Sequence, residues 1–534
     1  MTTTSDASRS TSTWAPLRSP IYRALWIAQL VSNLGTWMQT VGAQWMLVGD
    51  PRAAVLVPLV QTATTLPVML LALPSGVLAD LIDRRRLLIA TQGAMAAGVG
   101  LLATLTGFGL TTPAVLLMLL FLIGCGQALT APAWQAIQPD LVPAHQIPAA
   151  AALGSMSMNG ARAIGPAIAG VLVSLSGPTL VFALNAVSFV GIVFVLVSWR
   201  RPATTSDYPP ERALEALSAG GRFIRSSPIV RRILLRAALF IAPASALWGL
   251  LAVVAANHLG LSSAGYGLLL GALGVGAVSG AFLLGRLRAR FGQNVLLTVG
   301  AVGFAVATVV LAVVPIFGVV MVALVIGGAS WLLSLSTLNA SMQLSLPAWV
   351  RARGLSVYQL IFMGGQALGS VLWGVVAGAT TTSTSLLVSA GLLVVCALSA
   401  LWWPLHANTS NLDLTPSSHW PEPTLVFEPE PLDGPVLVLT SYRVTTENEE
   451  PFLAAMAVLG RSRQRTGASQ WRLFRSVEHE HTFIETFVVR SWGEHMHQHY
   501  TRLTGQDRII EETVEKYTDG DAVSEHYLAV HDAR

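Results

Sequence analysis

The sequence predicts an all-α membrane protein of twelve spans, followed by a small α+β domain at the carboxyl end. Hydrophobic residues make up 53% of the chain and charged residues only 11%, whereas charged residues are about a quarter of an ordinary soluble domain. Apolar stretches of about 20 residues, the length that crosses the roughly 30 Å hydrocarbon layer, fill residues 21–404. After Pro404 the composition becomes polar and acidic, which indicates a separate domain.

The expected spans have no polar face of the kind that soluble helices carry. Residues 1–19 are rich in Ser and Thr without an apolar core, so a disordered tail is expected there and not a cleavable signal. The expected spans lie near residues 21–48, 53–79, 87–108, 113–135, 148–175, 179–198, 233–257, 265–285, 293–314, 317–341, 356–378 and 385–403.

Arginine positions predict the orientation of the spans. Arginines gather in alternate loops, while the loops on the other side carry no Arg or Lys except Arg52. Because cytoplasmic loops carry the excess of Arg and Lys, both termini and the central loop 201–226 are predicted to be cytoplasmic. The charge of +4 is then a topology signal, and no nucleic-acid partner is expected. Besides the central loop, three of these arginine-bearing loops stand out, and they contain Arg84, Arg85 and Arg86, then Arg286, Arg288 and Arg290, and then Arg351 and Arg353.

Several function classes are disfavoured by missing patterns. Cys125 and Cys396 are the only cysteines, and both lie in apolar spans, so neither a disulfide framework nor a thiol metal site is expected. The chain contains no GxxxxGK[ST] pattern, which disfavours ATP-driven transport. We therefore expect no cofactor and no enzymatic activity.

The two expected halves, residues 20–200 and 227–404, repeat one another. Matching residues recur at an offset of 204. The halves are therefore predicted to be parallel six-span repeats, related by an axis along the membrane normal. The pairs are Ser75-Gly76 with Ser279-Gly280, Pro143 with Pro347, Gly165 with Gly369, Gly170 with Gly374, Arg84 with Arg288 and Arg86 with Arg290.

Residues 76–86, GVLADLIDRRR, resemble the loop signature of the major facilitator superfamily. Leu81 stands where the family usually has a basic residue, and Asp83 where it has a glycine. Residues 133–143 and 159–166 resemble the branch of the enterobactin exporter and the transmembrane secretion effectors. The resemblance covers residues 15–404 and implies a twelve-span secondary transporter in the bacterial inner membrane.

This resemblance implies efflux of a small hydrophobic or amphipathic molecule, such as a siderophore, antibiotic or drug, by alternating access. It also implies an antiporter coupled to protons. The residues weaken that coupling, because no Asp or Glu lies between Glu215 and Asp413, and Asp50 is the nearest approach to a membrane carboxylate. Two alternatives stay open: a lipid flippase on the same bundle, or a membrane-tethered enzyme whose carboxyl-terminal domain oxidises a substrate.

Arg162 is predicted to lie near the middle of the bilayer, about fourteen residues into span five. A charge there costs at least about 2.5 to 3.5 kcal/mol, so it normally faces a cavity or a partner. One interpretation is a cation that lines the cavity and binds an anionic or carbonyl-rich substrate. The other is a packing arginine bonded to helix carbonyls or to Asn159.

Polar residues on one face of span one suggest a lining for the cavity. Asn33, Thr36, Thr40 and Gln44 share that face, and Gln359 and Gln366 do likewise in span eleven. The alternative is that such side chains join helices by hydrogen bonds. Since spans one, four, seven and ten line the cavity in the superfamily, the resemblance adds Gln127, Trp248, Trp331 and Asn339.

The resemblance also implies a cytoplasmic gate. Gly76 and Asp80 belong to the loop signature, and Asp80 with Arg84, Arg85 and Arg288 would hold the halves together in the outward-open state. A carboxylate close to guanidinium groups forms a charge-assisted contact that opening would break. The alternative is that these charges only set the topology.

Residues 405–434 are predicted to be an extended linker, and residues 435–534 a cytoplasmic domain of ferredoxin-like fold. Strands are expected at 436–444, 470–477, 482–491 and 522–530, with helices at 447–464 and 493–517, broken near Gly505. Residues 487–499 resemble the antibiotic-biosynthesis-monooxygenase-like domain of some secretion effectors, which implies face-to-face homodimers.

Histidines in this domain raise the question of a metal. His495 and His499 are one helical turn apart, a spacing that suits a metal pair. No third ligand is evident, although His479, His481 and His497 are near in sequence. A solvated or pocket-lining cluster without a metal is therefore expected.

Overall fold

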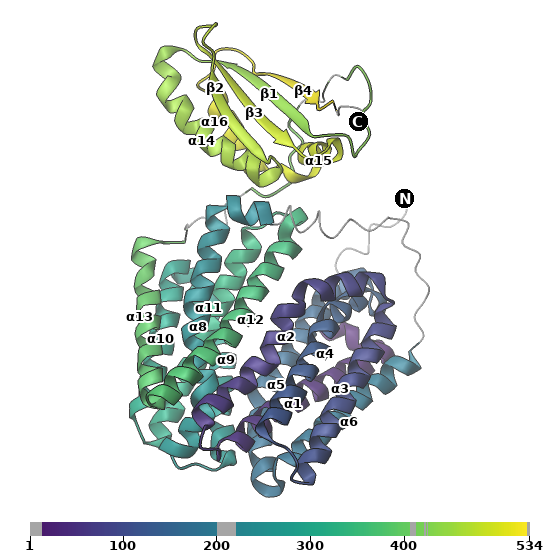
Figure 1. The fold of residues 1–534 in the computed structure, drawn as a ribbon, viewed down its shortest axis with the longest axis vertical. Helices are drawn as coiled ribbons and strands as arrows, with labels where there is room; N and C mark the ends of the chain where they lie inside the picture. Colours follow the sequence, from purple (N-terminus) through teal and green to yellow (C-terminus); the bar gives the residue numbers. More distant parts are fainter. Residues whose placement is uncertain (1–12, 200–220, 406–412, 421–422, 424, 531–534) are drawn as a thin grey trace, which may run out of the picture. The chain divides into compact units, whose positions relative to one another are not determined.

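The computed structural model describes residues 13–199, 221–405, 413–420, 423 and 425–530. Most of the expected tail 1–19, most of the central loop 201–226 and parts of the linker 405–434 lie outside these residues. The first half (purple to blue in Figure 1) begins with a short 3-10 helix, Ala15–Arg18. The side chains of Ser19, Asp83 and Thr112 cap the N-terminal ends of three of its long helices. Its long helices are α1 (Pro20–Leu47), α2 (Ala53–Leu81), α3 (Arg84–Gly107), α4 (Pro113–Leu141), α5 (Ile147–Ser176) and α6 (Pro178–Ser198).

The second half (teal to green in Figure 1) contains six more long helices among the described residues. The first of them continues into a single π-helical turn, Val254–His258. These helices are α8 (Pro228–Val253), α9 (Ser263–Arg290), α10 (Gln293–Val313), α11 (Phe317–Leu344), α12 (Ala348–Ala379) and α13 (Thr382–Trp402).

Within the described residues, eleven helices are long and apolar enough to cross a membrane. The remaining long helix, α1, has 28 residues, but its mean hydropathy is lowered by polar side chains at Asn33, Thr36, Thr40 and Gln44. The helix bounds agree with the expected spans within six residues, except that α12 begins eight residues before position 356. The predicted class, a helical membrane protein with a carboxyl-terminal α+β region, is confirmed.

The repeat is visible in how matching glycines pack within each half. Gly165 of α5 lies against α1, where an added Cβ would be 2.9 Å from Cβ of Trp37. Its counterpart Gly369 of α12 lies against α8, where an added Cβ would be 2.7 Å from the carbonyl oxygen of Ala242. Because glycine has no Cβ, the two helices can approach closely at this position in both halves.

The second matching pair packs across the two halves. A Cβ on Gly170 of α5 would be 2.5 Å from the carbonyl oxygen of Ser263 on α9. A Cβ on Gly374 of α12 would be 3.3 Å from Cβ of Pro58 on α2. The fifth helix of each half (α5 or α12) thus packs against the second helix of the other half (α9 or α2). Two parallel repeats around a common axis require this pairing.

The carboxyl-terminal domain contains a four-stranded antiparallel sheet of order β2-β3-β1-β4. Its elements follow the predicted βαββαβ order, which is the ferredoxin-like arrangement. The sheet and helices appear in yellow-green in Figure 1. They are β1 (Val436–Arg443), α14 (Glu449–Thr466), β2 (Gln470–Arg475), β3 (Thr482–Val489), α15 (Trp492–His497), the π-helical turn η6 (Gln498–Arg502), α16 (Gly505–Glu515) and β4 (Val523–Leu528).

Part of the expected linker packs onto this domain. The backbone N–H of Ser417 donates to the carbonyl of Leu503 at 3.0 Å, and that of Gly505 donates to the carbonyl of Thr415 at 3.0 Å. The indole of Trp420 packs beside Phe487, with ring centroids 6.4 Å apart. Residues 413–420 therefore form an additional edge of the domain, where the sequence predicted only a linker.

Candidate functional site

The halves are joined at the end of the bundle opposite the arginine-bearing loops. Nε2 of Gln61 on α2 donates to Oε1 of Gln366 on α12 at 2.8 Å, and the hydroxyl of Tyr266 on α9 donates to Oε1 of Gln44 on α1. Both contacts lie beside the close approaches of Gly170 and Gly374. This end of the pathway is therefore closed in the structure.

A cationic and aromatic cluster lies where the halves meet. Arg162 is at the middle of the 30-residue helix α5, and its guanidinium carbon is 5.5 Å from the ring centroid of Trp37 on α1. Trp248 of α8 lies 6.5 Å from Trp37 and 5.5 Å from Trp331 of α11, between ring centroids. Together these four side chains line a cavity of about 10 Å³. That is room for about one water molecule, so the site is nearly shut.

Two polar atoms of this cluster have no partner among the residues that the structure describes. They are Nε of Arg162 and Nε1 of Trp248, and both are buried. A buried donor without an acceptor costs roughly 1–3 kcal/mol, and more when it is charged. The cluster can therefore bind an oxygen-bearing, anionic group, with the indole faces covering its apolar part.

The predicted residues Arg162, Trp248 and Trp331 are thus brought together, and Trp37 joins them. The sequence interpretation overlooked Trp37. It lies four residues after Asn33, so it shares the polar face of α1 on which the prediction was based. That periodicity could have identified it.

Other residues of the α1 face make hydrogen bonds within the protein, either to another helix or within α1 itself. Nδ2 of Asn33 donates to Oγ of Ser157 on α5 at 3.0 Å. The hydroxyls of Thr36 and Thr40 donate to carbonyls one turn earlier in their own helix, each at 3.0 Å. In this state these side chains, like Gln44 and Gln366, have partners within the protein.

The remaining predicted lining residues lie apart from the cluster. Gln127 is half-buried on α4, and Gln359 is exposed on α12. Asn159 is exposed and donates to the carbonyl of Ser155 at 2.9 Å. Asn339 is exposed near the end of α11, and its Oδ1 accepts from Nε2 of Gln343 at 2.7 Å.

The predicted gate is described only in part, because the side chains of Gly76 and Asp80 lie outside the described residues. Arg84 is the first residue of α3, and Arg288 is exposed in the last turn of α9. Arg85 donates from Nε and Nη2 to the carbonyls of Leu196 and Val197, both at 2.8 Å. Arg85 therefore caps the end of α6 in this state.

Asp50 lies in the turn after α1. The backbone N–H of Arg52 donates to Oδ1 of Asp50 at 2.8 Å, and the guanidinium Nε lies 3.4 Å from the same oxygen. The backbone hydrogen bond and the charge of Arg52 hold the pKa of this carboxyl below its usual range. Asp50 is thus an ionised surface carboxylate.

The carboxyl-terminal domain has a second, larger cavity of about 620 Å³. It lies over the sheet face that carries Val438, with Trp420 and Arg463 in its wall. Buried Arg463 pairs with two carboxylates: its Nε lies 3.2 Å from Oε1 of Glu485, and its Nη1 contacts Glu511. This charge is compensated within the protein.

Glu511 is held ionised by that network. Burial raises the pKa of its carboxyl, but the charge of Arg463 and hydrogen bonds from His419 and Trp420 outweigh burial and leave the pKa lowered. His419 donates from Nε2 to Glu511 at 2.7 Å, and Trp420 donates from Nε1 at 2.8 Å. The domain thus has a roomy cavity beside a neutralised polar core.

Two known transporters are similar to this chain in sequence. The enterobactin exporter EntS of Citrobacter koseri is 28% identical over 385 residues, which cover 70% of this chain and 90% of that protein. The staphyloferrin A transporter of Staphylococcus aureus is 31% identical over 165 residues, which cover 30% of this chain and 42% of that protein.

Solved structures show the same membrane fold. A bacterial homologue of the human lysosomal transporter Spinster, inward-facing and occupied, matches with a TM-score of 0.60 at 17% identity, covering 72% of this chain and 97% of that one. The D323A mutant of the nucleoside transporter NupG matches with a TM-score of 0.59 at 15% identity, covering 72% and 100%. The family model for transmembrane secretion effectors matches residues 11–534, which include the carboxyl-terminal domain. The chain is a multi-pass membrane transporter of the major facilitator type and belongs to the transmembrane secretion effector family.

Proposed function

We propose that the protein exports an anionic, siderophore-like small molecule from the cytoplasm. The observation that carries the proposal is Arg162, a mid-helix guanidinium whose buried Nε has no partner among the described residues. The indole of Trp37 covers one side of it. Relatives named for enterobactin and for staphyloferrin A support this class of substrate.

The substrate's charge would replace the missing partner of Arg162. A guanidinium forms paired hydrogen bonds with carboxylate-like oxygens, and a low-dielectric site strengthens them. The rings of Trp248 and Trp331 would pack against apolar parts of the same molecule. A cavity of about 10 Å³ cannot hold such a molecule, so the halves must separate there during binding.

Alternating access follows from the packing of the halves. With both termini in the cytoplasm, the end closed by Gln61, Gln366 and the glycine contacts faces outward. Release would break these contacts, while Asp80 and Arg288 would come together on the cytoplasmic side. In the described parts of the spans no buried carboxylate accompanies Arg162, so proton coupling through the bundle stays a prediction, as does a homodimer of the carboxyl-terminal domain.

The test is accumulation of enterobactin and of staphyloferrin A by inside-out membrane vesicles that contain the protein. We expect uptake of at least one compound above vesicles without the protein, with a further increase when a proton gradient is imposed. Uptake that equals the empty-vesicle level for both compounds contradicts the proposed substrate class. Uptake without any response to the gradient removes the proton coupling and leaves export in place.

A further inference from the structure

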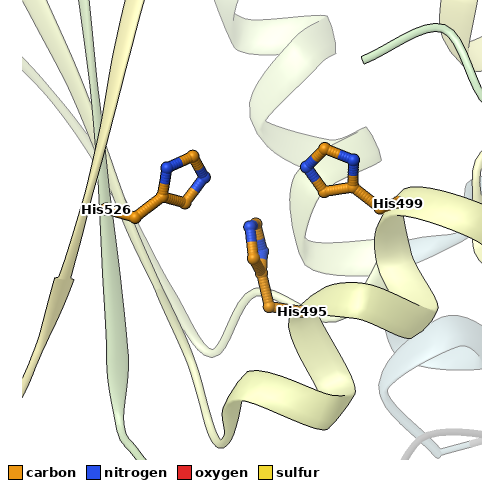
Figure 2. A group of neighbouring side chains, drawn as sticks. All are labelled: His495, His499 and His526. Carbon is orange, nitrogen blue, oxygen red and sulfur yellow. The ribbon is translucent and has the colours of Figure 1, made fainter. Parts of the chain in front are cut away.

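Three histidines of the carboxyl-terminal domain converge on one point (Figure 2). His495 lies in α15 and His499 one turn later in η6, while His526 comes from β4. Their potential ligand nitrogens all lie within 4.8 Å of one another. His526 is the third histidine that spacing along the chain did not reveal.

The sheet register explains why His526 belongs to this group. His526 pairs with Val438 of β1, and Val438 pairs in turn with Phe487 of β3. Paired residues point to the same face of a sheet. Since Val438 and Phe487 are buried on the face that α15 covers, His526 points toward His495. The ring centroids of His495 and His526 are 4.8 Å apart.

His495 is buried without a well-formed hydrogen bond to its ring. Its side chain is fully buried, and neither Nδ1 nor Nε2 has a hydrogen-bond partner of normal geometry among the described residues, although the side chain of Gln498 lies close enough to affect its pKa. A buried imidazole normally satisfies its polar atoms, since an unpaired one costs roughly 1–3 kcal/mol. Trp492 and Trp420 pack around the ring, at centroid distances of 5.6 and 6.2 Å. A bound ion would satisfy one of these nitrogens.

The three rings are also in the state that a metal requires. Burial, with the charges of His526 and His499, lowers the pKa of His495 to about 3. Burial, with the charge of His526, lowers the pKa of His499 to about 4, and burial lowers that of His526. Burial therefore favours the neutral imidazole, which is the form that offers a lone pair to a cation.

We propose that His495, His499 and His526 bind one divalent ion of the later first transition series, represented by Zn²⁺. Three imidazole ligands with one open position are a usual donor set for zinc. Zn–N bonds of about 2.0–2.1 Å place ligand nitrogens at most about 4.2 Å apart, so the rings rotate slightly inward on binding.

The open coordination position would face the large cavity. His499 and His526 line that cavity, together with Trp420 and Arg463. A fourth ligand with oxygen or nitrogen donors could enter from this side without disturbing the three rings. The site would thus be an exchangeable metal centre in the domain, a property that is independent of transport through the bundle.

Metal binding is tested on the full-length protein in detergent, purified with a tag that contains no histidine. The protein is stripped with a chelator, equilibrated with buffered Zn²⁺, and assayed for bound metal by mass spectrometry. We expect one Zn²⁺ per chain. His526→Gln and His499→Gln should each bind at least about 100-fold more weakly, because even outer partners of metal ligands are worth 10–100-fold.

His497→Gln is the matched control, since His497 is exposed on the same helix and outside the cluster. It should bind Zn²⁺ like the wild type. A wild type that binds no Zn²⁺, or a His526→Gln variant with unchanged affinity, overturns the proposal. The absorption spectrum of Co²⁺ bound to the wild type supplies a readout that needs no variant: bands of a four- or five-coordinate nitrogen site support it, and an octahedral aqua spectrum contradicts it.

Discussion

Two arginines that lie against indole rings, buried Arg463 in the carboxyl-terminal domain and half-buried Arg162 in the membrane region, differ in their partners. Arg463 of the carboxyl-terminal domain pairs with Glu485 and Glu511, and its guanidinium carbon lies 4.7 Å from the ring centroid of Trp420. Arg162 of the membrane region also lies against an indole, but its Nε has no partner among the described residues. The first charge is compensated within the protein, whereas the described residues supply no acceptor for Nε of the second.

The physical cost of each arrangement explains the difference. A buried ion pair is roughly balanced between desolvation and attraction, so it fixes geometry more than it adds stability. An uncompensated cation at mid-bilayer is costly by itself. We infer that the cost at Arg162 is retained because the substrate completes the site, whereas Arg463 serves the fold of its domain.

The largest effect is expected from removing Arg463, which pairs with Glu485 and Glu511. Arg463→Met leaves Glu485 buried without a cation and Glu511 with His419 alone, which should destabilise the domain by about 3–5 kcal/mol. Hydrogen exchange of residues 436–443 in the full-length protein measures this loss. Arg461→Met, an exposed neighbour on the same helix, should leave exchange unchanged. Equal exchange in the Arg463→Met variant would show that the pairing is not structural.

The next largest effect is expected from disturbing the contact between α5 and α9, which joins the two halves. Gly170→Leu places a side chain against Ser263 and Gly267 and should cost about 1–3 kcal/mol in the closed contact. Vesicle uptake should fall roughly tenfold, because this contact forms once in each cycle. Gly160→Leu, on the same helix with open space around its Cβ, is the control. Similar uptake by both variants would remove the role of the α5–α9 contact.

A smaller effect tests the aromatic wall of the same site. Trp37→Leu removes the ring beneath Arg162 and should raise the apparent KM about fivefold, since a cation–π contact is worth about 1 kcal/mol. Trp402→Leu, at an exposed position, should have no effect. A Trp37→Leu variant with unaltered KM would mean that Arg162 is held by its helix alone.

The smallest effect is a pH dependence of the compensated site. Burial lowers the pKa of His419, but the hydrogen bond and charge of Glu511 outweigh it, despite the opposing charge of Arg463, so the pKa is raised. Its stabilisation is therefore complete below the unfolded value of about 6.5 and is lost as pH rises through the folded value. We expect a loss under about 1 kcal/mol, seen as faster exchange around residues 413–420. His419→Gln should remove this dependence, and its persistence would assign the effect to another group.

Much of the membrane region could be predicted from sequence, because every span must be apolar over the thickness of the bilayer. Apolar length indicated where the helices lie. The offset of Gly165 and Gly170 from Gly369 and Gly374 predicted two like halves, and in the structure these glycines make matching contacts. The polar residues of α1 bond within the bundle in this state, so the cavity-lining role expected for them stays a prediction. Composition cannot distinguish a helix-joining amide from a cavity-lining one, since both need the same residue types.

In the carboxyl-terminal domain, the secondary structure could be predicted from the sequence, but the contacts of His526 and Trp420 could not. Its strands and helices followed from alternation and periodicity, whereas His526 is separated from His499 by a helix and meets it only through the register of β4 on β1. Trp420 joins the same cluster from residues expected to be linker. Contacts of this kind depend on register and on loops that fold back, which local pattern does not encode.

We propose that Arg162 holds the anionic part of a transported molecule. Equilibrium binding of radiolabelled enterobactin to the purified protein tests it most directly, by comparing the wild type with Arg162→Ala and Arg162→Lys. We expect alanine to weaken binding by about 10- to 100-fold, because a charged hydrogen bond worth about 1.5–3 kcal/mol is lost, and we expect lysine to restore part of it. Measurable binding by the wild type that is unchanged in Arg162→Ala would contradict the claim.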